Sequence, residues 1–310
     1  MWNFPLFPER ASTVAGQVDM LLAFMLVVAA FFSLLIACLI VFFSVKYHYK
    51  SPVDRQGARD SHLLLELLWT GIPLSIVMFV FVWGAKVFYR MRTIPTDALD
   101  IFVVGQQWMW KVQHPGGQRE INALHVPVNR PVQLTMISQD VIHDFSVPAF
   151  RIKQDVVPGQ YTYQWFQATK TGEYHLFCDQ YCGTLHAQMI GKVNVMEPYD
   201  FENWLSHWAA PLAPMAATGA DLFQRMACAT CHMDPRRAPS LIGLYGRKVI
   251  LANGETVLAD EGYLRESIVR PAAKVVRGYE PTMPSYQNQL DEQSLHQLIT
   301  YIKSLNEKTP

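Results

Sequence analysis

Residues Cys178–Met189 read CDQYCGTLHAQM, and the chemistry of this short stretch sets what the rest of the chain must build. Two cysteines, one histidine and one methionine follow each other at intervals of three, three and two intervening residues. Thiolate, imidazole and thioether are soft or borderline ligands that copper prefers, whereas zinc rarely takes a thioether. One thiolate with two histidines and a weak methionine makes a mononuclear copper site. The second thiolate supplies enough donors for two metals with both sulfurs bridging.

A second imidazole is available upstream. His143 begins the phrase HDFSVPAF and is far from the cysteines in sequence, so folding must bring it to them. Two simpler interpretations stay open at this point, a disulfide between Cys178 and Cys182 and a zinc site. A disulfide explains neither His186 nor Met189, which favours copper.

The segment around these ligands is expected to be an all-β domain. From about Leu99 to Met196 the chain shows short strand-like runs separated by turn signals such as Pro158-Gly159 and Thr171-Gly172. This pattern predicts a small antiparallel sandwich or barrel. It is similar to a cupredoxin, in which metal-binding loops lie at one end of the barrel.

The N-terminal part predicts a membrane hairpin. Leu21 to Val45 is one uncharged apolar run, long enough at about 1.5 Å per residue to cross a ~30 Å hydrocarbon layer. A second run extends from Leu63 to about Tyr89. The short loop between them is rich in Lys and Arg and is expected in the cytoplasm. Both termini are then expected on the periplasmic or outer side. Residues 1–18 do not show the pattern of a cleavable signal peptide.

Overall composition adds little further. The formal net charge of the chain is zero, which argues against nucleic-acid binding. Four of the five cysteines stand in close pairs, and Cys38 lies in the first apolar run, where it is expected to act as a small hydrophobe. Glu66 lies about one turn inside the second run. An intramembrane carboxylate favours a functional role, and a position at the lipid headgroups is the alternative.

A second cofactor pattern follows the β region. Residues 228–232 read CATCH, the C-x-x-C-H pattern of covalent c-type haem attachment, in which two thiols form thioethers and the adjacent imidazole binds iron. A redox C-x-x-C and half of a zinc site are the alternatives. A sixth iron ligand is usually a methionine further along, and Met283 in TMPSY is the best candidate.

The sequence around this motif supports a small helical domain. An Ala/Pro-rich stretch within residues 199–218 predicts a linker, preceded by a short amphipathic helix around Phe201–Trp208. Beyond it, helical segments before the motif and near the C-terminus are expected to cross with Phe223 against Tyr301. A backbone carbonyl in Ala238-Pro239 is a candidate partner for the second ring nitrogen of His232. Residues 219–305 resemble a class I cytochrome c domain.

Taken together, these motifs resemble subunit II of a haem–copper cytochrome c oxidase with a fused cytochrome c. The loop Cys178–Met189 resembles that family's dinuclear copper (CuA) loop, and ELLWTGIP at Glu66–Pro73 resembles its E-x-x-W-T-x-x-P signature. The expected architecture is a multidomain membrane protein with a two-helix transmembrane hairpin, an all-β cupredoxin-like barrel and an all-α cytochrome c domain. The corresponding ranges are 1–95 for the N-terminal segment and hairpin, 96–198 for the CuA domain, 199–218 for the linker and 219–310 for the haem domain.

The resemblance also implies roles for individual residues. The implied copper ligands are the side chains of His143, Cys178, Cys182, His186 and Met189 with the backbone carbonyl of Gln180. Most members of the family have glutamate at this last position, and its side chain also contacts a magnesium ion between subunits. Gln180 keeps the carbonyl but removes that charge. Trp108 in QWMW matches the tryptophan through which electrons reach CuA, with a core aromatic as the alternative, and Glu66 matches a glutamate at the mouth of a proton pathway.

The implied function is that of the electron-input subunit of a proton-translocating cytochrome-c oxidase. Electrons from a soluble cytochrome c or another small redox protein would pass through the haem on Cys228, Cys231, His232 and Met283 and through CuA to the oxygen-reducing subunit I. The expected location is the bacterial inner membrane. A membrane copper carrier, a quinol oxidase subunit and another CuA-dependent reductase such as nitrous oxide reductase are the alternatives. The copper ligands argue against the quinol oxidase, and covalent haem argues against the carrier.

Overall fold

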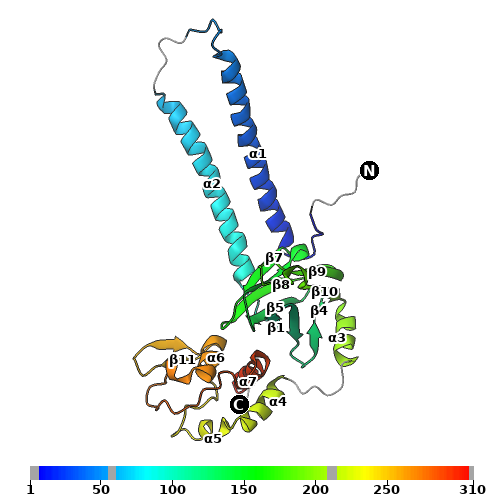
Figure 1. The fold of residues 1–310 in the computed structure, drawn as a ribbon, viewed down its shortest axis with the longest axis vertical. Coiled ribbons are helices and arrows are strands. Elements are labelled where there is room, and N and C mark those ends of the chain that lie inside the picture. The colour runs from blue at the N-terminus through cyan, green and yellow to red at the C-terminus, as the bar shows by residue number, and fades with distance from the viewer. Residues whose placement is uncertain (1–6, 55–60, 208–214, 307–310) are drawn as a thin grey trace.

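The computed structural model describes residues 7–54, 61–207 and 215–306 of the chain. Three parts follow one another along it: a pair of long helices, a β domain and a helical C-terminal domain (Figure 1). The long helices extend away from the β domain on one side, and the C-terminal domain packs against it on another (Figure 1). The predicted fold class is therefore confirmed in its three components.

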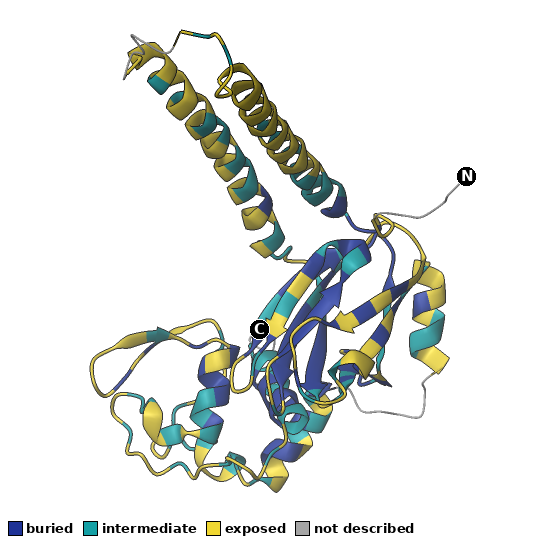
Figure 2. Cartoon of the chain, turned by 45° about the horizontal axis from the view of Figure 1, so that its top comes forward, coloured by how far each residue is buried: buried dark blue, intermediate teal, exposed yellow. Residues whose placement is uncertain are grey.

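The helical pair is formed by α1 (Ala15–Lys46) and α2 (Leu63–Arg92). Both are longer than the roughly 20 residues needed to cross a bilayer, and almost none of their residues is buried in the isolated chain (Figure 2). A few aromatic contacts join them, including Phe24 with Trp83 at 5.8 Å between ring centroids. Helices of this length without a polar face need lipid or a partner protein around them.

The β domain consists of two five-stranded sheets, ordered β3-β2-β1-β5-β8 and β4-β10-β9-β6-β7. Their strands are β1 (Leu99–Gln106), β2 (Met109–Gln113), β3 (Arg119–Ile121), β4 (Ala123–Pro127), β5 (Pro131–Ser138), β6 (His143–Val147), β7 (Ile152–Val156), β8 (Thr162–Gln167), β9 (Gly172–Cys178) and β10 (Ile190–Met196). The expectation of an antiparallel domain was wrong for two pairings, because β1 pairs with β5 and β4 with β10 in parallel. Parallel pairing needs a long crossover connection, which alternation within single strands does not reveal.

Side chains from both sheets fill the space between them. Successive side chains of strand β1 point to opposite faces of its sheet. Ile101 and Val103 point into this core, and Phe102 and Val104 point to the opposite face. Trp110 is fully buried and packs edge-on against Phe145. The outward face of β1 is also covered, because the C-terminal domain packs on it.

Residues before the first long helix belong to the β domain. Ala11 and Val14 are buried in its core. Ser12 forms an isolated antiparallel β-bridge with Ala168, and the Ala11 amide donates to the Ala149 carbonyl at 3.0 Å. The guanidinium of Arg151 contacts the Asp19 carboxylate through Nε at 2.7 Å. The base of α1 is thus attached to the β domain on both sides of its first turn.

A buried carboxylate attaches the helix that follows the β domain. Helix α3 (Pro198–His207) places Trp204 in stacked contact with His125, 4.5 Å between ring centroids. Beneath it, Glu120 bridges two histidines, with 2.8 Å to His114 Nε2 and 2.5 Å to His125 Nδ1. Burial raises the pKa of Glu120, but hydrogen bonds from both histidines outweigh burial and lower it to about 2.

The C-terminal domain contains α4 (Met215–Arg225), α5 (Ala229–His232), α6 (Glu261–Val269) and α7 (Glu292–Ser304). Helices α4 and α7 cross closely, because a Cβ on Gly219 would lie 2.0 Å from the Gln297 carbonyl oxygen. Phe223 and Tyr301 meet at this crossing with ring centroids 5.3 Å apart, as predicted. The domain is not purely helical. A hairpin of β11 (Lys248–Ile250) and β12 (Thr256–Leu258) turns at Gly254, which has φ +88°.

The predicted linker contains regular structure at both ends. Helix α3 covers the amphipathic stretch that was expected to be helical, and α4 begins at Met215. Residues 208–214 between them lie outside the described part of the chain.

Candidate metal and haem sites

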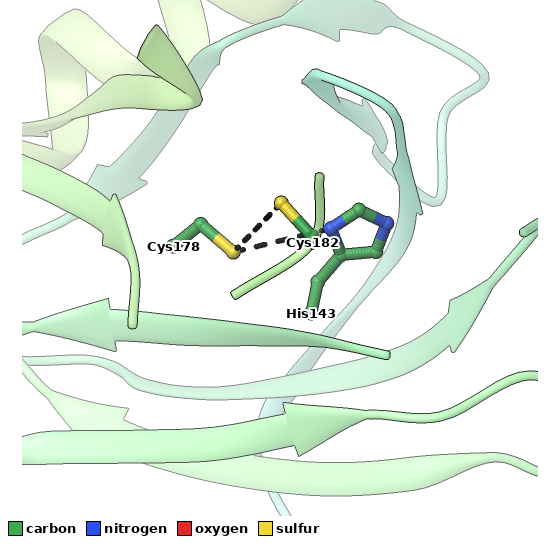
Figure 3. Close-up of side chains that lie close together, drawn as sticks. All are labelled: His143, Cys178 and Cys182. Carbon is green, nitrogen blue, oxygen red and sulfur yellow. Dashed lines mark hydrogen bonds between the residues drawn. The ribbon is translucent and has the colours of Figure 1, made fainter. Parts of the chain in front are cut away.

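Three side chains distant in sequence meet at one end of the β domain. His143 begins β6, Cys178 ends β9, and Cys182 follows in the loop between β9 and β10 (Figure 3). One ligand atom from each lies within 4.8 Å of the others, and all three residues are buried. The two sulfurs are 3.7 Å apart, and His143 Nδ1 is 3.9 Å from Cys178 Sγ.

The remaining donors of the loop surround the same point. Cys182 Sγ lies 3.5 Å from His186 Nδ1 and 3.8 Å from Met189 Sδ. Cys178 Sγ lies 3.2 Å from the Gln180 carbonyl oxygen. Two thiols, two imidazole nitrogens, one thioether and one carbonyl therefore converge. This donor set fits a dinuclear copper site better than zinc.

The two thiols differ in their acid–base properties. Burial raises the pKa of Cys178, but hydrogen bonds from His143 and from neighbouring backbone groups outweigh it and lower the pKa. The pKa of Cys182 is raised by burial and by the Cys178 sulfur beside it. Two thiolates this close repel each other, so both are deprotonated together only when positive charge lies between them.

A second layer of residues fixes the ligands. The Asp140 carboxylate contacts His143 Nε2 at 2.8 Å, which leaves Nδ1 directed at the sulfurs, and it accepts the Gln107 amide N–H at 2.7 Å. The Gln107 side chain donates to the Cys182 carbonyl at 2.8 Å. No sequence motif marks Asp140 or Gln107 as part of the site. The spacing of Asp140 three residues before His143 was the available signal.

Trp108 lies beside the copper loop. A Cβ on Gly183, whose φ is +119°, would lie 3.3 Å from Trp108 Cζ2 and 2.9 Å from the Gln107 side-chain nitrogen. The indole therefore packs against the loop backbone, and a larger residue than glycine would displace it. Trp108 is partly buried against the core of the β domain.

The C-x-x-C-H motif opens onto a cavity of about 330 Å³ in the C-terminal domain. Its lining includes Cys228, Cys231, His232 and Met283 together with apolar side chains of α6 and α7. His232 Nδ1 lies 2.9 Å from the Pro239 carbonyl oxygen, the partner expected from the sequence. This contact fixes the ring and leaves Nε2 for a metal. An apolar cavity with two thiols and an oriented imidazole fits covalent haem.

Glu66 lies in the first turn of α2. Its carboxylate accepts the backbone N–H of His62 at 3.1 Å, and the His62 side chain accepts the N–H of Leu65 at 3.4 Å. This reciprocal pair is a capping arrangement at the helix N-terminus. Glu66 therefore contributes to the helix end, independently of any function in proton transfer.

Comparison with known families matches all three parts of the chain. Residues 1–87 match the transmembrane domain of cytochrome c oxidase subunit II, and residues 118–196 match its periplasmic domain. Residues 214–302 match the family described as cytochrome c oxidase, cbb3-type, subunit III. The last match covers the C-x-x-C-H cavity and supports a cytochrome c domain.

Individual relatives agree with these matches. Cytochrome c oxidase subunit 2 of Thermostichus vulcanus is 30% identical over 64% of this chain and 77% of its own length. The subunit 2 of Cereibacter sphaeroides is 29% identical over 64% and 78%. A crystal structure of the periplasmic domain of subunit II from Bradyrhizobium japonicum is 31% identical, with a TM-score of 0.37, and covers 39% of this chain and 100% of that chain.

Proposed function

Because this chain belongs to the cytochrome c oxidase subunit II family and carries a cytochrome c domain, we propose that it is the electron-input subunit of its haem–copper oxidase. The observation that carries the proposal is the presence, in one chain, of a six-donor cluster and a C-x-x-C-H cavity. When bound, dinuclear copper and haem c supply two one-electron redox centres. An external donor, such as a soluble cytochrome c, would deliver electrons that finally reach the oxygen-reducing subunit I.

We assign the copper ligands as His143, Cys178, Cys182, His186 and Met189 with the Gln180 carbonyl. Their mutual distances of 3.2–3.9 Å support the assignment. Trp108 is proposed to pass electrons to copper, supported by its packing on the loop. Gln180 offers no carboxylate to a magnesium ion.

We assign Cys228 and Cys231 to haem attachment, His232 to the proximal position and Met283 to the opposite face. Placement of all four on one cavity supports this. The proposed domain ranges are 1–95, 96–198, 199–218 and 219–310, and residues 11–14 of the first range pack into the core of the second. The two apolar helices make the chain a membrane protein with a periplasmic domain. We further propose that it lies in the bacterial inner membrane with both termini on the periplasmic side.

The full-length protein loaded with copper and haem tests the function. We expect a mixed-valence copper signal, the absorption band of methionine-ligated ferric haem, and copper reduction after flash reduction of the haem. Met283→Ala should remove the absorption band and leave the copper signal intact. A haem that stays reduced beside oxidised copper would contradict the proposed function. A band that survives Met283→Ala would assign the sixth position to another residue.

Glu66 is proposed to take part in proton uptake, and Glu66→Gln separates this role from capping. Glutamine at this position keeps an oxygen acceptor for the His62 N–H but cannot exchange a proton. We expect slower turnover of the assembled oxidase with unchanged copper reduction. Turnover equal to that of the wild type would leave Glu66 with its capping role alone.

A further inference from the structure

Helix α7 presents two functional faces. Leu298 and Ile302 line the haem cavity. His296 and Gln293 lie on a different face and contact the β domain, His296 through Phe102 and Gln293 through Gln113. Residues three or four positions apart share one side of a helix, so one helix borders the cavity and the neighbouring domain at the same time.

The contact at the centre of this second face is a ring stack. His296 lies flat on Phe102 of β1, with 3.7 Å between ring centroids and an interplanar angle of 2°. Tyr161 approaches the edges of both rings at 6.1 Å. Both stacked residues are buried, His296 to 4% and Phe102 to 2% exposure. Burial lowers the pKa of His296 to about 3, so the imidazole in this contact is neutral.

Polar contacts surround the stack. Arg265 of α6 donates from Nη1 to the Gly159 carbonyl at 2.8 Å and is held on its other side by Glu292. The Gln293 side chain donates to Gln113 at 2.7 Å. This contact has a buried centre of stacked rings and a border of partly buried polar residues. Specific interfaces between proteins are organised in the same way. The two domains are thus joined by more than the chain between them.

Strand β1 continues from the stack to the copper ligands. Phe102 faces the C-terminal domain, and Gly105, three residues further along, faces His143. A Cβ on Gly105 would lie 2.9 Å from His143 Cδ2, so glycine lets the imidazole rest directly on the strand. On the other side, His296 is two residues from the cavity-lining Leu298.

We propose that the Phe102–His296 stack is the docking junction that holds the haem domain on the β domain and completes the contact route between the two redox sites. The inference rests on the proposed function, since it concerns the passage from haem to copper. Within α7 and within β1 the route follows covalent bonds of the chain. The ring stack is the non-covalent step between the two domains. Electron transfer weakens steeply with each added gap, so loss of the junction slows transfer without removing either cofactor.

Phe102→Asp in the loaded full-length protein tests the junction. Burying an unpaired carboxylate against the imidazole should shift the docking equilibrium about tenfold or more toward separation. Docking is measured by mass spectrometry of His296 after brief treatment with diethyl pyrocarbonate, with the exposed His175 as reference. Transfer is measured by flash reduction of the haem. Ile121→Asp, at an exposed position of β3 in the same sheet, is the matched control, and Phe102→Tyr keeps the ring.

We expect His296 to be protected in wild type, Ile121→Asp and Phe102→Tyr, and to react about tenfold faster in Phe102→Asp, in which transfer also slows. The copper signal and haem spectrum should be the same in all four proteins. Equal His296 reactivity in wild type and Phe102→Asp would overturn the junction. Exposed His296 with an unchanged transfer rate would overturn the route. Absence of transfer in the wild type with His296 still protected would instead reject the proposed function.

Discussion

The Cys182→Ser variant is expected to lose the mixed-valence copper signal completely. Cys182 Sγ is the atom that lies close to Cys178, His186 and Met189 together, so its removal separates the donors into two incomplete sets. Serine is a hard oxygen ligand and does not replace a thiolate on copper. Electron paramagnetic resonance of the loaded protein should change from hyperfine coupling to two equivalent nuclei to a mononuclear four-line spectrum.

Cys38→Ser is the matched control for this experiment. It makes the same substitution on α1, where the thiol is exposed and belongs to the apolar surface of the helix. It should leave the copper signal unchanged. Persistence of coupling to two nuclei in Cys182→Ser would show that the second thiolate is dispensable and that the ligand assignment is wrong.

Glu120→Gln is expected to lower the free energy of unfolding of the β domain by about 3 kcal/mol. Glu120 is buried, and its carboxylate contacts two histidines at once. An amide offers one acceptor atom and one donor atom in its place. One histidine therefore loses its carboxylate acceptor, which weakens the support of α3, since α3 rests on His125 through Trp204. Denaturant unfolding followed by tryptophan fluorescence measures the change.

The same carboxylate predicts a pH dependence. Its pKa is lowered from 4.5 to about 2 in the folded protein, so its contribution is fully present above about pH 4.5 and is lost as pH falls toward 2. Glu120→Gln should remove this part of the acid sensitivity. Glu173→Gln is the control, because its ion pair with Lys192 is solvent-exposed and worth at most about 1 kcal/mol. If Glu120→Gln and Glu173→Gln had equal midpoints of denaturant unfolding, a bridging role of Glu120 would be contradicted.

The clustering of the proposed copper and haem residues could be predicted from sequence because most of them belong to two short motifs. The Cys178–Met189 loop and C-x-x-C-H each indicate their candidate ligands by type and spacing. A carbonyl in Ala238-Pro239 was expected close to His232, and the Pro239 carbonyl occupies that place. The same holds for Phe223 and Tyr301, whose helices show clear periodicity.

Contacts between distant polar residues were not predictable in this way. The Glu120 cluster and the Gln107 contact join single residues that no motif marks. The Phe102–His296 stack depends on which face of β1 is covered by another domain, and alternation along a strand shows two faces without showing what packs on either. The parallel pairs depend on crossover topology for the same reason.

The segment before α1 has a consequence for how the protein is made. Ala11 and Val14 complete the core of a domain whose strands are synthesised only after both long helices. The segment before α1 therefore cannot complete its core contacts until the strands of the β domain have been synthesised. A soluble fragment that starts at the first strand would lack Ser12 opposite Ala168 and would carry an open core and an unpaired edge, a known origin of aggregation. Folding of the β domain is thus coupled to the placement of the segment before α1 on the same side of the two long helices.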